Sequence, residues 1–273
     1  MNLFRRIFMH MHERVLRRLD SPAISYKQRI FNNMDNFYRY ARKGDIILVE
    51  GRSELSRIIK LFSNSHWSHS AMYVGDELIR KNRPDREKYL EKFGEEAKHL
   101  VIEALAGEGV VANPASKYQD HNIRICRPFK LYKEDQQVVL DHVINSIGQQ
   151  YDQQNIIDIA LLLLPKWLNP FKKRSIRACL GNCDGFQVIC SGILARAFQR
   201  VGYPVFPELR ESFAQAEAHP DNPFGAPLIM RHYSQILPRD FDLSPNFEII
   251  KFNVIATGKF DYRNLVWDEE ENL

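Results

Sequence analysis

Residues 67–75 have the sequence WSHSAMYVG, and this stretch decides how the rest of the chain is interpreted. It is rich in residues that favour strands and ends at a Gly-Asp turn, so we predict a β-strand here. His69 shares one face of that strand with Trp67, Ala71 and Tyr73, because side chains alternate between the two faces. We therefore expect His69 to point out of a sheet, toward a helix packed on that face.

Turn-bounded apolar runs and apolar residues at helical spacing predict the neighbouring elements. We expect strands at 46–49, 100–105 and 246–253. We expect helices after a cap at Ser53, over 133–147 with Gly148 as the cap, and from 189 to a stop at Gly202. Residues 81–98 are dense in charge and are predicted to form an exposed, partly helical insertion.

Composition excludes several classes of protein. The chain has 273 residues, 44% of them hydrophobic, which is enough for a large core and excludes a disordered tail. Residues 1–43 hold ten Lys and Arg against three acidic residues, so the net charge of +4 is a local feature and argues only weakly for nucleic acid. The longest apolar run is too short to span a bilayer, and no secretory signal is evident, so we expect a cytoplasmic protein.

The first twenty residues place apolar side chains at helical spacing with arginines between them. This pattern predicts a basic amphipathic helix. It could contact an anionic membrane surface, which would make the protein peripheral at the inner membrane, or it could pack on its own domain. The sequence leaves both readings open.

Cys190 is the candidate nucleophile. It falls where a helix is predicted to begin, and a helix N-terminus stabilises a thiolate. Taken alone, the same residue could be a small buried hydrophobe in register with Leu194 and Ala197. Catalysis would also need a base, and His69 is the best candidate among the histidines. Glu103 lies inside an apolar strand, where it could orient His69, hold a substrate amine, or face solvent at a sheet edge.

Other chemistries fit less well. Cys179, Cys183 and Cys190 have a Cys-x3-Cys-x6-Cys spacing with no well-placed fourth ligand, so we predict no metal site. Ser191 lacks the Gly-x-Ser-x-Gly pattern of a serine nucleophile. No glycine motif for phosphate binding is present.

The ordered set of motifs resembles a known family. Gly44-Asp45 opens a strand, His69 opens the next, Glu103 follows on a third, Gly148-x2-Tyr151-Asp152 comes later, and Cys190 opens a helix. This order resembles the circularly permuted papain-like cysteine hydrolases, the YiiX-like branch of the NlpC-type superfamily, with lecithin:retinol acyltransferase-like proteins as distant relatives. In ordinary papain-like enzymes the Cys helix precedes the His strand.

The resemblance implies an α+β fold in which the Cys-bearing helix packs on an antiparallel sheet that bears the His. It implies that Cys190 is the nucleophile, His69 the general base and Glu103 the acidic third residue. It also implies that Tyr151 lines the substrate pocket, and we add Trp67 and Ser191 as neighbours of the catalytic pair that could bind substrate.

We accordingly predict an N-terminal extension at 1–42, a permuted papain-like domain at 43–255 and a tail at 256–273. The expected function is a cysteine-dependent hydrolase or acyltransferase acting through an acyl-enzyme on an amide or ester bond, in a cell-wall peptide or a lipid, without a cofactor. The alternative is a non-catalytic module of the same fold that binds a lipid or an amine.

Overall fold

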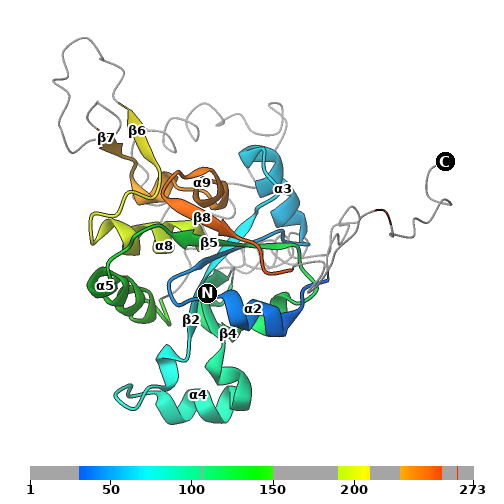
Figure 1. Ribbon diagram of the computed structural model, residues 1–273, viewed down its shortest axis with the longest axis vertical. Coiled ribbons are helices and arrows are strands. Elements are labelled where there is room, and N and C mark those ends of the chain that lie inside the picture. Colours follow the sequence, from blue (N-terminus) through cyan, green and yellow to red (C-terminus); the bar gives the residue numbers. More distant parts are fainter. Residues whose placement is uncertain (1–30, 106, 150–189, 210–227, 254–262, 264–273) are drawn as a thin grey trace, which may run out of the picture.

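The computed structural model describes residues 31–105, 107–149, 190–209, 228–253 and 263 (Figure 1). The predicted helix in the first twenty residues, Tyr151, Cys179 and Cys183 lie outside the described residues. Within the described part of the chain, no helix is both long enough and apolar enough to cross a membrane. The predicted domain boundaries stay a prediction.

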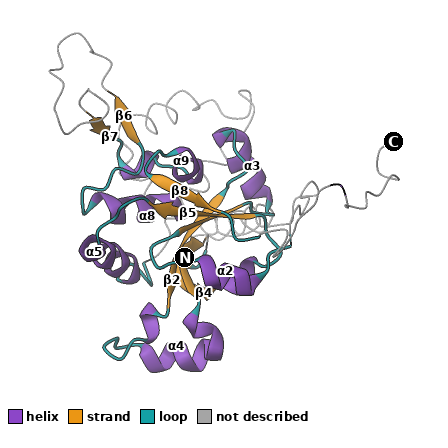
Figure 2. Cartoon of the chain, viewed as in Figure 1, coloured by secondary structure: helices purple, strands orange, loops and turns teal. Residues whose placement is uncertain are grey.

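An antiparallel sheet of six strands forms the centre of the molecule (Figure 2). Its strand order is β4-β3-β2-β1-β5-β8, and every neighbouring pair is antiparallel. The strands are β1 (Ile46–Val49), β2 (His69–Gly75), β3 (Leu100–Leu105), β4 (Gly109–Pro114), β5 (Ile123–Pro128) and β8 (Phe247–Ile250). A separate two-stranded sheet pairs β6 (Pro207–Leu209) with β7 (Leu228–Met230).

Three helices cover one face of the sheet: α5 (Lys133–Ile144), α8 (Cys190–Gln199) and α9 (Pro238–Leu243). Their apolar side chains pack against the even-numbered side chains of β1 and β2, such as Leu48 and Met72, in the larger core. Helix α8 is buried along nearly its whole length. The predicted α+β class, with a Cys-bearing helix packed on an antiparallel sheet, is confirmed.

The opposite face carries α2 (Met34–Tyr40) and a smaller core. Phe37 of α2 is buried there, and its ring meets the rings of Tyr73 and Phe252 edge to face, with centroids 5.7 and 5.4 Å apart. Ala71 belongs to the same core. The face that His69 shares with Ala71 and Tyr73 is therefore covered by a helix, as expected, and that helix is α2. Trp67, which we expected on this face, belongs instead to the larger core, because it precedes the strand.

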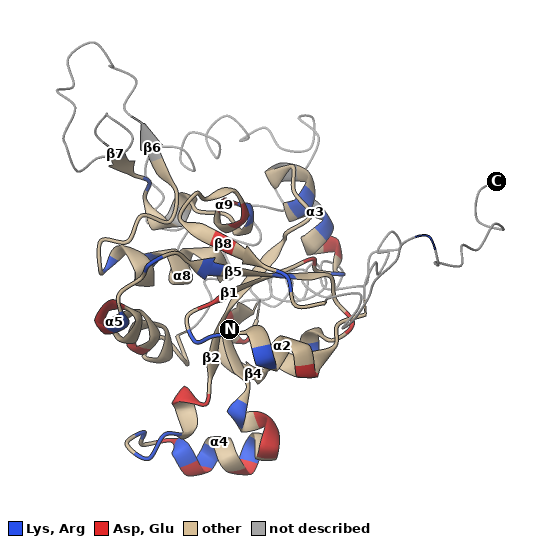
Figure 3. Cartoon of the chain, viewed as in Figure 1, with Lys and Arg blue, Asp and Glu red and all other residues tan. Residues whose placement is uncertain are grey.

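The predicted insertion is confirmed as a helical, charged excursion between β2 and β3. It contains η1 (Glu77–Ile79), α4 (Arg86–Phe93) and η2 (Gly94–Lys98), and acidic and basic residues alternate over it (Figure 3). Glu77 lies at the start of the insertion, and its buried carboxylate forms ion pairs with Lys43 at 2.8 Å and with Arg80 at 3.0 Å. After this insertion the chain returns to the sheet, where β3 pairs with β2.

Most predicted boundaries agree with the structure, and three shift. Helix α3 (Glu54–Ser63) is capped by the Ser53 side chain, as expected. Helix α5 ends at Ile144 rather than at 147, because the next residues form turns and the Gly148 N–H donates to Val110 on the edge strand at 2.9 Å. The last strand is shorter than predicted, and Trp67 lies just before β2.

A buried ion pair joins the start of β1 to β5. Arg127 donates to both oxygens of Asp45, at 2.9 and 2.7 Å, and the Asp45 carboxylate also accepts the Arg42 N–H at 2.7 Å. Only 1% of the Asp45 side chain is exposed. A bidentate pair of this kind fixes how the two strands meet, since an unpaired charge there would lack solvent.

We predict that Arg127→Met lowers the free energy of unfolding by about 3 to 5 kcal/mol, because it leaves the Asp45 carboxylate buried without a cation. Urea unfolding followed by circular dichroism measures the change. As a control, Arg57→Met breaks an exposed pair with Glu54 and should cost about 1 kcal/mol or less. Equal losses in the two variants would contradict the role given to Asp45.

Candidate active site

His69 is the first residue of β2 and lies between two other strands. Val49 of β1 pairs with it on one side. On the other side β3 brings Glu103 opposite Ala71, two residues along β2 and on the same face as His69. The imidazole Nε2 of His69 lies 2.7 Å from Oε2 of Glu103. The sheet register therefore joins two residues that the insertion separates in sequence.

Glu103 is a buried carboxylate, 2% exposed, that four side chains surround. Besides His69, its oxygens accept from Asn113 at 3.0 Å and from Lys117 at 2.6 Å, and they also accept the Tyr118 hydroxyl. Burial alone would raise the pKa of Glu103, but His69 and Lys117 hold it well below its ordinary range. Glu103 is therefore a fixed negative charge beneath the imidazole.

Cys190 is the first residue of α8 and is 6% exposed. Its Sγ accepts the backbone N–H of Ser70 at 3.3 Å. Ser70 lies just beyond Ala71–Glu103, the last pair in the ladder between β2 and β3. The sulfur thus sits where these two strands part. Helix α8 packs on one face of the sheet, and His69 shares the other face with Ala71. The Cys190 sulfur can lie near His69 because β3 no longer pairs with β2 at this point.

The thiol and the imidazole interact directly. Burial alone would lower the pKa of His69, but the charge and hydrogen bond of Cys190, followed by those of Glu103, raise it to about 10. Burial alone would raise the pKa of Cys190, but His69 and then Ser70 lower it. Both directions favour a thiolate beside an imidazolium at neutral pH, which is the reactive form of a cysteine nucleophile.

The remaining predicted site residues have different surroundings. The Ser191 hydroxyl is buried and donates to the Ile236 carbonyl at 2.7 Å, which anchors α8. The Trp67 indole N–H donates to Asp242 at 3.0 Å. The roles in substrate binding that we predict for Trp67, Ser191 and Tyr151 stay predictions.

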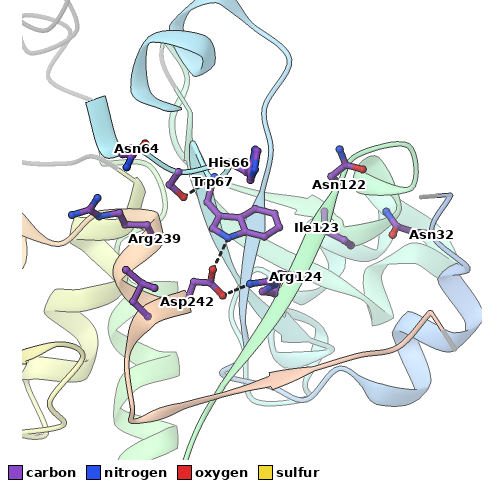
Figure 4. Close-up of a pocket in the computed structure, with 11 residues that line it drawn as sticks. Asn32, Asn64, His66, Trp67, Asn122, Ile123, Arg124, Arg239 and Asp242 are labelled. Carbon is purple, nitrogen blue, oxygen red and sulfur yellow. Dashed lines mark hydrogen bonds and ion pairs between the residues drawn. The ribbon is translucent and has the colours of Figure 1, made fainter. Parts of the chain in front are cut away.

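A cleft of about 400 Å³ opens beside this end of the sheet (Figure 4). Its lining comes from Asn32, residues 64–67, residues 122–124 and α9. Val49 pairs with His69 on one side and with Ile123 on the other. Because strands lie about 4.8 Å apart, the cleft wall at Ile123 is about 10 Å from His69. Cys190, His69 and Glu103 are not among the residues that line it.

One wall of the cleft is a small polar cluster. Arg124 contacts the second oxygen of Asp242, and its guanidinium lies 5.0 Å from the centre of the Trp67 ring. Trp67 and Arg124 therefore occupy both oxygens of Asp242 (Figure 4). The wall offers an aromatic surface and a partly exposed cation.

Sequence reasoning missed the residues that hold Glu103. Asn113 is on β4, and Lys117 and Tyr118 are on η3 (Ala115–Tyr118). Lys117 and Tyr118 follow a strand that ends at a proline, so nothing in their spacing relates them to Glu103. Only the pairing of β3 with β4 brings these side chains together.

No group of metal-ligating side chains occurs among the residues that the structure describes. Within the same residues Cys126 and Cys190 are the free cysteines. Cys126 is fully buried, and burial raises the pKa of its thiol. The two thiols therefore have opposite electrostatic surroundings, and only Cys190 has a histidine beside it.

Part of the chain matches the model of a known protein family. Residues 40–158 match the family described as permuted papain-like amidase enzyme, YaeF/YiiX, C92 family. This match includes His69 and Glu103 and ends before Cys190. Among curated proteins, none matches the chain. The crystal structure of the metalloprotein yiiX from Escherichia coli O157:H7 is similar with a TM-score of 0.44 and 17% identity, over 78% of this chain and 98% of that chain.

The family match supports a papain-like amidase or hydrolase, with a small molecule or a peptide as substrate. It also agrees with the antiparallel sheet. The similarity of this chain to the permuted papain-like hydrolases of the YiiX-like branch, predicted from its sequence, is therefore confirmed.

Proposed function

We propose that the chain is a cysteine-dependent amidase in which Cys190 is the nucleophile, His69 the acid and base, and Glu103 the residue that orients His69. One observation carries this proposal. A line of contacts runs from the buried Glu103 carboxylate through the partly exposed His69 ring to the buried Cys190 sulfur. A carboxylate, an imidazole and a nucleophile in this order have the roles of a catalytic triad.

The reaction follows from these positions. The Cys190 thiolate attacks the carbonyl carbon of an amide, and the electron pair of the C=O bond moves to oxygen. Backbone N–H groups at the start of α8 are suited to hold that oxyanion. As the C–N bond breaks, the His69 imidazolium gives its proton to the leaving amine. His69 then removes a proton from water, which attacks the acyl-enzyme and releases the acid and the thiolate.

The same acyl-enzyme could react with an amine or an alcohol in place of water, so an acyltransferase or an esterase uses the same residues. The cleft near this end of the sheet mixes polar and apolar surface, and its lining includes Arg124 and Arg239 together with Asp242, which pairs with Arg124. This lining supports a substrate with both polar and apolar parts, such as a peptide.

We predict that Cys190→Ser and His69→Ala each lower the rate of amide hydrolysis by about a thousandfold or more, since each removes a member of the reacting pair. Release of the amine from a panel of acyl-amide and peptide substrates measures the rate. The stability of Cys190→Ser should stay within about 1 kcal/mol of the wild type, because the side chains have similar size.

Cys126→Ala is the matched control, because it removes a buried thiol that has no histidine partner. It should retain activity. Activity that survives in Cys190→Ser would exclude the proposed nucleophile. A wild-type protein that binds lipids or amines but hydrolyses nothing would favour the non-catalytic module.

We predict that Cys190 reacts with iodoacetamide with an apparent pKa well below the value of about 8.5 for a free thiol. The rate should stay high as the pH rises toward 10, where His69 loses its proton. Glu103→Gln removes the charge that supports the imidazolium, so the apparent pKa of Cys190 should rise. Mass spectrometry of the labelled peptide, measured across pH, gives both values.

Glu50→Gln is the control for this experiment, because Glu50 is also buried and contacts Lys60 and Asn122 rather than His69. The apparent pKa of Cys190 should not change in this variant. If the wild type and Glu103→Gln give the same pH profile, Glu103 does not act on the reacting pair.

We also propose a peripheral, cytoplasmic location in which residues 1–20 contact an anionic membrane. The basic amphipathic pattern supports this. Deletion of residues 1–30 should weaken sedimentation with phosphatidylglycerol vesicles and leave the fold intact, because the anchoring contacts of Asn32 and Phe37 remain. Vesicles of phosphatidylcholine are the control. Unchanged binding to the anionic vesicles would contradict the membrane contact and favour the alternative, in which residues 1–20 pack on their own domain.

A further inference from the structure

Ser70 is a buried polar residue whose hydroxyl lies beside the Cys190 sulfur but makes no well-formed hydrogen bond to the described residues. Its exposure is 0%, and among the described residues its Oγ has no hydrogen-bond partner of acceptable geometry. In the sheet it pairs with Leu48, a member of the larger core, so its side chain faces α8 rather than α2. His69 and Ser70 are therefore neighbours in sequence that project from opposite faces of β2 toward the same sulfur.

A buried hydroxyl without a partner is unfavourable for folding, because it gives up its hydrogen bonds to water and gains none. Such a group in a folded protein calls for an explanation. The backbone N–H of the same residue already donates to Cys190 Sγ at 3.3 Å. A thiol sulfur is a weak acceptor, whereas a thiolate is a strong one, and a hydroxyl hydrogen can rotate to meet it.

We propose that the Ser70 hydroxyl is a second donor to the Cys190 thiolate, so that Ser70 holds the ionised sulfur through both its backbone N–H and its side chain. This inference rests on the proposed function, since it assigns a further residue to the same nucleophile. The hydroxyl stays without a good partner while the sulfur is protonated. It gains one when the sulfur becomes charged.

The electrostatic surroundings of Cys190 agree with this role. His69 on β2 is the main group that lowers the pKa of the thiol, against the effect of burial, and the Ser70 side chain and backbone follow. Glu103 on β3 lies behind His69 and supports its positive charge. Tyr118 on η3 also senses the thiolate, whose charge contributes to the raised pKa of its hydroxyl. Of these groups, only Ser70 offers two uncharged donors to the sulfur.

The test is the pH profile of Cys190 alkylation by iodoacetamide in the full chain. In Ser70→Ala the apparent pKa of Cys190 should rise by about one unit, which means about tenfold slower labelling at pH values below that pKa. Thermal unfolding should show Ser70→Ala to be as stable as the wild type or more so, because the variant removes an unpaired buried hydroxyl. Ser70→Gly repeats the removal without the methyl group and should give the same pH profile.

Ser68→Ala is the matched control, because Ser68 lies two residues before Ser70, directly ahead of β2. The Ser68 hydroxyl is also buried, but it accepts the Gly51 N–H at 2.9 Å, so its loss should lower stability and leave the pKa of Cys190 unchanged. An unchanged pKa in both Ser70 variants, beside a low pKa in the wild type, would overturn the role of Ser70 alone. An ordinary thiol pKa in the wild type would instead overturn the proposed function.

Discussion

The contact between Glu103 and His69 is the interaction on which the rest of the site depends. A carboxylate that is 2% exposed is stable as an anion only if donors and positive charge surround it. Here β2, β4 and η3 supply them, through His69, Asn113, and the pair Lys117 and Tyr118. The cluster therefore fixes the position of three elements at once. Cys190 and, after it, the Glu103 anion raise the pKa of the imidazole.

The two faces of the sheet hold different parts of the site. One face packs against α8 and delivers the Cys190 sulfur, and the other face packs against α2 and holds the Glu103 cluster. The two meet only where β2 extends beyond its last pair with β3. A thiolate and a carboxylate are both negative and would repel each other, so placing them on opposite sides of the imidazole lets one cation stabilise both.

Much of this arrangement could be predicted from the sequence. Apolar runs between turn residues predicted β1 and β3, and helical spacing predicted α3, α5 and α8. The order in which His69 precedes Cys190 predicted the permuted fold. Alternation along a strand says which residues share a face but not which helix covers it, so the sequence did not show that α2 covers the face of Ala71 and Tyr73. Lys117 and Tyr118 were missed, since only the pairing of β3 with β4 brings them to Glu103.

The insertion between β2 and β3 shows why distance along the chain is a poor guide to this site. Glu103 follows His69 by 34 residues, yet the two strands are adjacent and in register. The detour costs little closure entropy, because that cost grows only with the logarithm of loop length. The buried Glu77 and its cations fix the point where the detour leaves the sheet, so β3 returns in one register. The length of this insertion therefore does not prevent Glu103 from meeting His69, because the register of β2 and β3 is set by the sheet and by the contacts at the base of the insertion.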